Sequence, residues 1–162
     1  MKAMGVVREN RKERMLRLYD THARTVWRIC RLYLNEAEAE DAVHDVFLKL
    51  LTRDITLRDA EHEKAWLIRV ARNLCCDRLR ARSRRALPLE EAADSASEDV
   101  PSDVLRAVRA LPEPLGTVVY LHYYEGYSAA EIGRIMERSE ATVYRWLGEA
   151  RQRLRVELET NV

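Results

Sequence analysis

Apolar residues in the first half of the chain recur at steps of three and four, the spacing that predicts one buried face of an α-helix. Three such faces can be read, and Asn35 is expected to end the first helix. They consist of Leu16, Tyr19, Ala23, Val26, Cys30 and Tyr33, then Ala39, Val43, Val46, Phe47 and Leu50, and finally Leu67, Ala71, Leu74 and Leu79. Residues 52–61, between the second and third helices, lose the period and are expected to form a loop.

The helical period fails from Ser83 to Asp103. This stretch contains Pro88, Pro101, four serines and a run of acidic residues, a composition typical of a flexible linker. We therefore expect a helical domain over 8–85, an acidic linker over 86–103 and a second helical domain over 104–158.

The second domain is expected to contain a helix-turn-helix. This domain begins with a short helix that contains Val104, Val108 and Leu111, followed by a second helix that contains Leu115, Val118 and Val119 and ends near Gly126. After these helices, Ser128 and Glu131 have the spacing of a capping box. Ile132, Ile135 and Met136 form a buried face, and Gly133 is small enough to let another helix cross closely. A break at Glu137–Arg138 precedes Ser139, which can cap a last helix with Val143, Leu147, Ala150, Leu154 and Leu158 on one side.

The outer face of that last helix carries Glu140, Thr142, Tyr144, Arg145 and Arg151. A second helix presented in this way can enter the major groove of DNA, where an arginine reads guanine through two hydrogen bonds. The alternative is an ordinary helical hairpin, because Glu137 occupies the turn position that is usually glycine.

Composition and charge narrow the fold and the partners. Only five glycines and four prolines occur among 162 residues, which favours an all-α fold of long helices. The net charge of +1 conceals seven arginines against one acid over 69–85, six acids and no base over 86–105, and six arginines against three glutamates over 134–155. Two basic patches indicate two contacts with a polyanion, although arginine-rich helix faces are also common as solvated surface.

Signals for other chemistry are weak. The three cysteines, Cys30, Cys75 and Cys76, have no ligand-like spacing, and the four histidines form no metal-binding motif. We therefore expect no metal, no cofactor and no catalytic residue. The N-terminus does not resemble a signal peptide, and no apolar run is long enough for a membrane span, so we expect a cytoplasmic protein without direct membrane insertion.

Three segments together resemble a bacterial RNA polymerase sigma factor of the extracytoplasmic-function class, which has only regions 2 and 4. They are AEDAVHDVFLKLL, WLIRVARNLCCDRLR and the stretch from LPEPLGTVVY to EARQRL, and the resemblance spans roughly residues 12–158. It implies a sigma region 2-like domain of three or four helices and a sigma region 4-like helix-turn-helix domain. It also implies that the chain binds core RNA polymerase and directs transcription initiation at promoters with a −10 and a −35 element.

The resemblance implies roles for matching residues. The β′ clamp helices of the polymerase would bind Asp41, Val43, His44, Asp45, Val46 and Phe47, although Phe47 can also be read as core. The −10 element would be read by Arg72, Asn73, Asp77 and Arg80, and the loop from Thr52 to Glu61 would capture a base flipped from the melted strand. The −35 element would be read by Arg138, Ser139, Thr142, Tyr144, Arg145 and Arg151.

The implied partners are core RNA polymerase, through its β′ clamp helices and β flap, double-stranded and melted promoter DNA, and an anti-sigma factor. Gly116 departs from the family pattern, in which arginine is frequent at this position. Two other readings stay open: an autonomous helix-turn-helix regulator that binds an operator as a dimer, and an interaction protein that sequesters a partner. The helix around AEDAVHDVFLKLL counts against the first, and an enzyme fits least.

Overall fold

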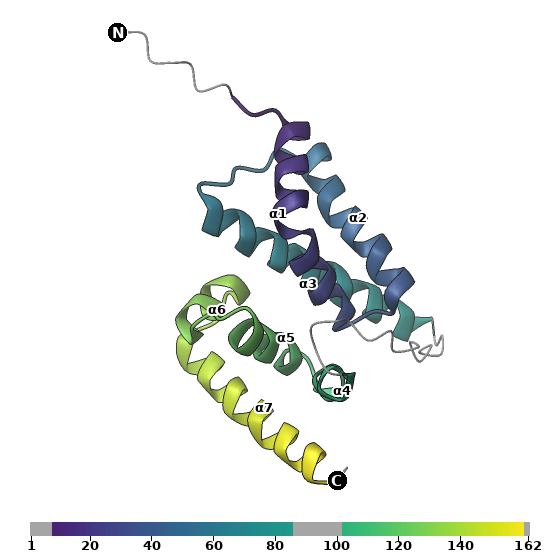
Figure 1. The fold of residues 1–162 in the computed structure, drawn as a ribbon, viewed down its shortest axis with the longest axis vertical. Helices are drawn as coiled ribbons and strands as arrows, with labels where there is room; N and C mark the ends of the chain where they lie inside the picture. The colour runs from purple at the N-terminus through teal and green to yellow at the C-terminus, as the bar shows by residue number, and fades with distance from the viewer. Residues whose placement is uncertain (1–7, 86–101, 161–162) are drawn as a thin grey trace.

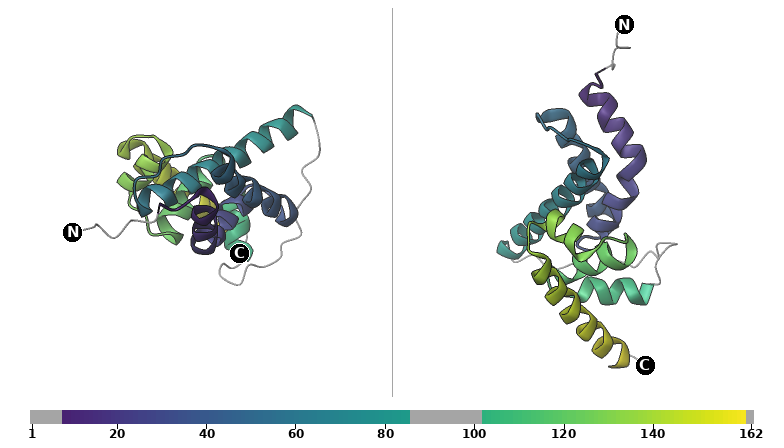
Figure 2. Two further views of the ribbon diagram at one scale, coloured as in Figure 1. Left: turned by 90° about the horizontal axis from the view of Figure 1, so that it is seen from above. Right: turned by 90° about the vertical axis from the view of Figure 1, so that its left-hand side faces the viewer.

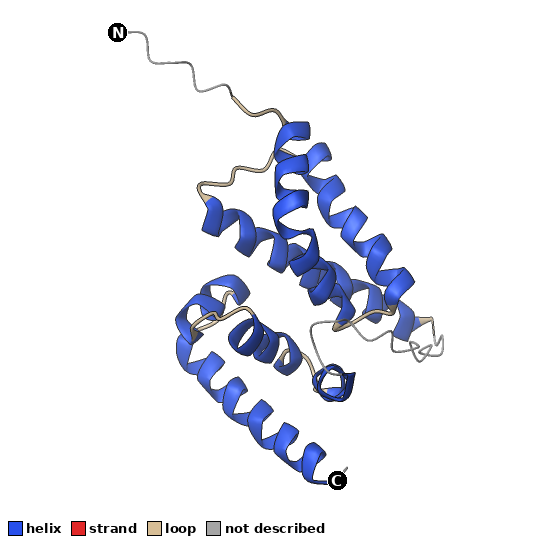
Figure 3. Ribbon diagram, in the orientation of Figure 1, coloured by secondary structure: helices blue, strands red, loops and turns tan. Residues whose placement is uncertain are grey.

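The computed structural model describes residues 8–85 and 102–160, and within them the fold is all-helical (Figures 1 and 3). Three long helices form an N-terminal bundle: α1 (Arg11–Arg31), α2 (Glu36–Thr52) and α3 (Ala60–Arg84). Their buried faces share one core that includes Val26, Ile29, Val46, Leu50 and Leu67. The predicted all-α class and the three helices of the first half are confirmed.

Each of these helices begins at a side-chain cap. The side chains of Asn10, Asn35 and Asp59 each accept a hydrogen bond from the backbone N–H three residues on, at 2.8 Å. Such caps satisfy amides that have no partner inside the helix. The prediction that Asn35 ends the first helix is wrong, because Asn35 caps the start of α2 and α1 ends at Arg31.

The predicted buried face of α1 is confirmed in part. Val26 and Cys30 are buried as predicted, and Leu18 and Ile29 are buried although the prediction omitted them, whereas Leu16 and Tyr19 are 50% and 41% exposed. Leu16 lies roughly a quarter turn from the centre of the buried face, since successive residues advance by about 100°. Tyr19 keeps an edge-to-face contact with Phe47, with ring centroids 5.0 Å apart.

The C-terminal half contains α4 (Ser102–Ala110), α5 (Leu115–Val119), the π-helical turn η1 (Tyr120–Tyr124), α6 (Ala129–Met136) and α7 (Glu140–Thr160). The predicted single helix before Gly126 is thus α5 followed by a wider turn, in which the Glu125 N–H donates to the Tyr120 carbonyl at 3.2 Å. Because α4 begins at Ser102, the expected linker of 86–103 overlaps the helix by two residues, and residues 86–101 lie outside the described part of the chain.

The expected helix-turn-helix is formed by α6 and α7. The Ser128 hydroxyl accepts from the Glu131 N–H at 3.2 Å and the Glu131 carboxylate accepts from the Ser128 N–H at 3.1 Å, so the capping box is confirmed. Ser139 caps α7 by accepting from the Thr142 N–H at 3.2 Å. Of the predicted α7 stripe, Val143, Leu147 and Ala150 are buried, Leu154 is half-buried, and the Leu158 side chain lies outside the described residues.

Three positions in this half explain how tightly the helices approach. Glu137 adopts the left-handed conformation (φ 57°), so a non-glycine residue makes the sharp turn between α6 and α7. A Cβ atom at Gly133 would lie 2.6 Å from the Arg138 carbonyl oxygen, which confirms the close approach expected there. A Cβ atom at Gly116 would lie 2.8 Å from the Val108 carbonyl oxygen, so a larger side chain would not fit there without moving α4.

The two halves lie against each other along α3. The end of α6 is packed beside α3, and the views of Figure 2 agree with this placement. Within the described residues, no helix is both long and apolar enough to cross a membrane.

Candidate nucleic-acid interface

An exposed polar stripe runs along the outer side of α3. Asn73, Asp77 and Arg80 follow one another at steps of four and three, and all three are exposed. Arg84, which sequence reasoning did not single out, continues the stripe four residues further on. Asp77 and Arg80 form an ion pair at 3.5 Å with both side chains about 70% exposed. An asparagine amide and exposed arginines can donate hydrogen bonds to bases and phosphates.

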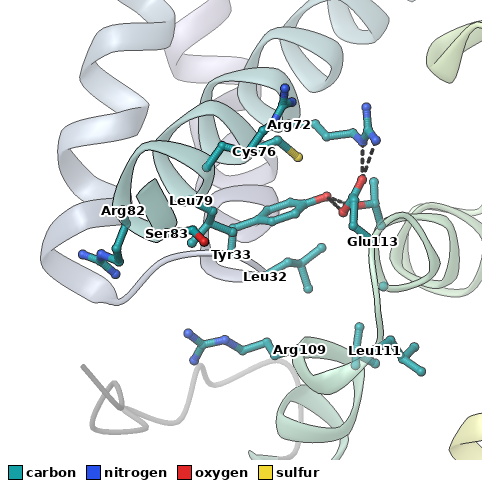
Figure 4. Close-up of a pocket in the computed structure, with 14 residues that line it drawn as sticks. Leu32, Tyr33, Arg72, Cys76, Leu79, Arg82, Ser83, Arg109, Leu111 and Glu113 are labelled. Carbon is teal, nitrogen blue, oxygen red and sulfur yellow. Dashed lines mark hydrogen bonds and ion pairs between the residues drawn. The ribbon is translucent and has the colours of Figure 1, made fainter. Parts of the chain in front are cut away.

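Arg72, the fourth residue predicted for the −10 element, does not lie on this stripe. Its guanidinium is directed into the junction between the halves, where Nε donates to Glu113 at 2.7 Å and Nη2 lies 2.5 Å from the same oxygen (Figure 4). Burial alone would lower the pKa of Arg72, but the Glu113 carboxylate outweighs this effect and raises it. Arg72 therefore stays charged and is paired within the protein.

Three further arginines of the basic stretch are also engaged by protein groups. Arg69 donates to the Ile135 carbonyl at 2.9 Å, Arg78 pairs with Asp41 at 3.1 Å and with Asp45, and Arg82 pairs with Glu38 at 2.5 Å. The predicted basic patch is therefore divided between internal ion pairs and the exposed α3 stripe. Sequence spacing could not show this division, because the acidic partners come from other helices.

The outer face of α2 carries only part of the set predicted to bind polymerase. Val43, Val46 and Phe47 are 5%, 0% and 3% exposed and belong to the core, so their side chains cannot contact a partner without unfolding the bundle. Asp41 and His44 are exposed and Asp45 is half-buried. Leu48, which the sequence reading missed, is 51% exposed on the same face, four residues after His44. A large exposed apolar residue among polar neighbours is a common feature of protein-binding surfaces.

The predicted loop over 52–61 is shorter than expected, because α2 extends to Thr52 and α3 starts at Ala60. Ile55 and Leu57 are partly buried against the core. Arg14 of α1 donates to the Ile55 carbonyl at 2.8 Å, which fixes the loop to the bundle.

The exposed face of the helix-turn-helix gathers most of the residues predicted to read the −35 element. Arg138, Ser139, Tyr144, Arg145 and Arg151 are exposed, and Thr142 is partly buried. The Ser139 and Thr142 hydroxyls lie 2.8 Å apart, and Arg151 donates to the Tyr123 hydroxyl at 3.3 Å, which orients the arginine. Glu149 is paired with Arg153 of the next turn at 3.2 Å.

The cysteines contribute to packing. Cys30 and Cys75 are fully buried free thiols, and their mutual hydrogen bond, with burial, raises the pKa of Cys75. A raised pKa disfavours the thiolate that acts as nucleophile or metal ligand. Among residues 8–85 and 102–160, no group of His, Cys, Asp and Glu side chains is placed to hold a metal ion.

Comparison with known families agrees with this architecture. The family model described as Sigma-70 region 2 matches residues 18–85, and the one described as Sigma-70, region 4 matches residues 102–154. The ECF RNA polymerase sigma factor SigL of Mycobacterium tuberculosis is 31% identical over 157 residues, covering 90% of this chain and 89% of the relative. SigM of the same organism is 32% identical over 143 residues, covering 85% of this chain and 73% of the relative.

Two solved structures share the fold. The sigma factor RpoE of Bartonella quintana, in complex with the anti-sigma factor NepR, superposes with a TM-score of 0.74 at 19% identity over 93% of this chain and 99% of that chain. CnrH, in complex with the cytosolic domain of CnrY, superposes with a TM-score of 0.67 at 22% identity over 94% and 92%. The two family models, matched in order along one chain, define a two-region sigma factor. The chain belongs to the extracytoplasmic-function (ECF) family of RNA polymerase sigma factors.

Proposed function

We propose that this protein binds core RNA polymerase and directs promoter-specific transcription initiation by reading the −10 element with region 2 and the −35 element with region 4. The observation that carries this proposal is the presence of both regions, in order, in one chain that aligns with most of the length of SigL. The polymerase supplies the chemistry, so the chain is not an enzyme. It acts in the cytoplasm, where the polymerase and the chromosome are found.

The outer face of α2 is our candidate for the β′ clamp helices. We assign the contact to four residues that share one face of α2: Asp41, His44, Asp45 and Leu48. Asp41, His44 and Leu48 are exposed, and Asp45 is half-buried. Region 4 would bind the β flap. Val43, Val46 and Phe47 support this face from inside the bundle and are no longer candidates for contact.

A matched pair of leucines tests the clamp assignment. Leu48→Asp should weaken binding to core polymerase by about tenfold or more, as expected for an apolar residue at the centre of an interface. Leu16→Asp is the control, since Leu16 is 50% exposed and Leu48 51%. Both variants should unfold within about 0.5 kcal/mol of the wild type, as exposed positions do. Equal loss of polymerase binding in the two variants would contradict the assignment.

In region 4, Arg145 and Arg151 have different proposed roles. Arg145 lies in the second turn of α7, where it can contact base edges, and Arg151 lies further along the helix, where phosphates are nearer. Arg145→Ala should reduce discrimination between promoter sequences by about 1–3 kcal/mol, whereas Arg151→Ala should weaken binding to all sequences alike. Binding of the two variants to promoter fragments with single-base changes in the −35 element measures the difference. A sequence-dependent loss from Arg151→Ala would refute this division of roles.

We also propose an anti-sigma factor as a partner. The support is that RpoE and CnrH, which share the fold, were solved in complex with the anti-sigma factor NepR and with CnrY. Affinity purification of the tagged chain from its native cell should recover a protein that blocks transcription when added back. Recovery of polymerase subunits alone would count against such a partner.

A further inference from the structure

A small cavity lies where the end of α1 meets α4 and the π-helical turn η1. Its volume is about 170 Å³, and its walls include the apolar side chains of Trp27, Leu32 and Val108 and the ring of Tyr120. Val104, which also lines the cavity, is 44% exposed, so the cavity is open to solvent on that side. An apolar cavity of about 150 Å³ holds one benzene ring. The space therefore suits a ligand with a single ring or a branched group of similar size.

The tyrosines of η1 contribute rings to this cavity, because two of their hydroxyls are bonded to other residues. The Tyr120 hydroxyl donates to Glu125 at 2.7 Å, and the Tyr123 hydroxyl accepts from Arg151 at 3.3 Å. The rings of Tyr120 and Tyr124 are stacked with their centroids 5.2 Å apart. Aromatic walls of this kind favour an apolar ligand, and an aromatic one in particular.

One charged side chain of the cavity wall has an unused hydrogen-bond donor. Arg31, the last residue of α1, is only 6% exposed. Its Nη1 donates to the Leu34 carbonyl at 2.9 Å, whereas its Nη2 is buried and has no hydrogen-bond partner in the part of the chain that the structure describes. Buried polar atoms in folded proteins are nearly always bonded, and a buried charge without a partner is costly. An anion beside Nη2 would supply both the acceptor and the opposite charge.

Further positive charge lies close to this donor. Arg109 of α4 donates to the same Leu34 carbonyl at 3.4 Å, so two guanidinium groups meet at one oxygen. Arg28, one turn before Arg31, also lines the cavity, with its guanidinium carbon 4.8 Å from the centroid of the Tyr124 ring. Like charges at short range repel each other, so this environment favours a ligand with a negative charge over a neutral one.

We propose that the cavity binds a small carboxylic acid with an aromatic or branched apolar group, its carboxylate on Arg31 and its apolar group against Trp27, Val108 and Tyr120. A hydrogen bond between a guanidinium and a carboxylate is charge-assisted and stronger than a neutral one. The helix of a partner protein fits this space less well, because it needs a groove long enough for anchors on several turns. A bound ligand would contact α1 of region 2 and both α4 and η1 of region 4, so its binding is linked to the relative position of the two regions.

The experiment compares two probes by fluorine NMR line broadening with the full-length protein at neutral pH. Para-fluorobenzoate and para-fluorobenzyl alcohol share the ring and differ in charge. The benzoate should bind about tenfold more tightly, the factor expected from one charge-assisted hydrogen bond. Equal affinities would overturn the anion site, and a benzoate signal that does not broaden at millimolar concentration would overturn the cavity as a ligand site. Acetate, which has the charge but no ring, should displace the benzoate probe far less effectively than unlabelled benzoate does.

A matched pair of valines tests where the probe binds. Val104→Trp places a large side chain at the open side of the cavity and should weaken benzoate binding about tenfold or more. Val156→Trp is the control, because Val156 is 57% exposed on α7 and does not line the cavity. Both positions are exposed, so neither substitution should alter the free energy of unfolding by more than about 0.5 kcal/mol. Unchanged binding by Val104→Trp, or an equal loss in both variants, would contradict this location.

The role of Arg31 is tested by the preference between the two probes. Arg31→Met removes the charge and keeps an apolar stem, so it should bind the alcohol as tightly as wild type does and the benzoate no more tightly than the alcohol. Arg31→Lys keeps the charge and should retain a several-fold preference for the benzoate. A full tenfold preference in Arg31→Met would overturn the assignment of Arg31. The comparison of probes in wild type needs no substitution, so the test stands if Arg31→Met fails to fold. Neither DNA nor polymerase is present, so the result is separate from that of the proposed function.

Discussion

Gly133→Ala should disrupt the helix-turn-helix although it adds a single methyl group. The added Cβ would lie 2.6 Å from the Arg138 carbonyl oxygen, which is a backbone atom of the turn and cannot rotate away. An ordinary contact is longer by about 1 Å, so the turn or the start of α7 must move. Overpacking of this kind costs about 1–3 kcal/mol, and a rigid backbone neighbour places Gly133 near the upper end. Alanine is favoured over glycine in a helix by about 1 kcal/mol, so the free energy of unfolding should fall by a net amount of about 2 kcal/mol.

The control for this variant is Gly148→Ala in the middle of α7. A Cβ atom there would have no neighbour within 4 Å, so only the gain in helix propensity applies and region 4 should become more stable by about 0.5–1 kcal/mol. Thermal unfolding followed by circular dichroism measures both, and a loss of 2 kcal/mol corresponds to a fall in Tm of about 8–16 °C for a domain of this size. Equal Tm changes in the two variants would refute the reasoning from the close approach at Gly133.

Three further predictions concern the cap of α6 and promoter recognition. Ser128→Ala should cost about 1 kcal/mol in thermal unfolding, because it removes the N-cap acceptor of the Glu131 N–H, and an unchanged Tm would contradict this. Hydrogen bonds from the Ser128 backbone and hydroxyl lower the pKa of Glu131. Ionised Glu131 therefore stabilises the fold above its unfolded pKa, and this stabilisation is lost as the pH falls through its folded pKa. The Tm difference between wild type and Glu131→Gln should narrow below about pH 4. Asn73→Ala should impair strand opening at the −10 element, detected by permanganate footprinting, without changing −35 binding.

The helices could be predicted from sequence to a large extent because their signals are local. The capping box at Ser128 and Glu131 lies within four residues, and the bonds expected from it are present. The stripe of Val143, Leu147 and Ala150 likewise needs only helical spacing. Asparagine is common both just after the end of a helix and at the N-cap of the next one. Sequence alone therefore could not decide whether Asn35 ends α1 or caps the start of α2.

The sites were less predictable because burial depends on residues distant in sequence. Val43, Val46 and Phe47 share the helix of Asp41 and His44, and only the packing of α1 and α3 shows which side faces inward. Arg72 and Asn73 are neighbours in sequence, yet one is held by Glu113, 41 positions away, and the other is exposed. Leu48 was missed because it lies outside the apolar stripe of its helix, and periodicity alone assigns no role to an apolar residue on the polar face.

The spacing between the two DNA elements tests whether both regions read one promoter. DNA completes a turn in about 10 base pairs, so an insertion of about five places one element on the opposite face of the duplex. Such an insertion should nearly eliminate transcription, because the polymerase fixes where regions 2 and 4 sit and both must engage together for their contacts to add.

The most direct test is transcription in a reconstituted system that contains core RNA polymerase, this chain and genomic fragments upstream of genes that depend on it. Discrete transcripts should start at fixed positions only when both the chain and core polymerase are present, and at limiting concentrations of the chain Leu48→Asp should reduce their yield strongly while Leu16→Asp preserves it. Transcripts of equal yield without the chain, or operator binding by the chain that neither needs nor recruits polymerase, would contradict its role as a sigma factor.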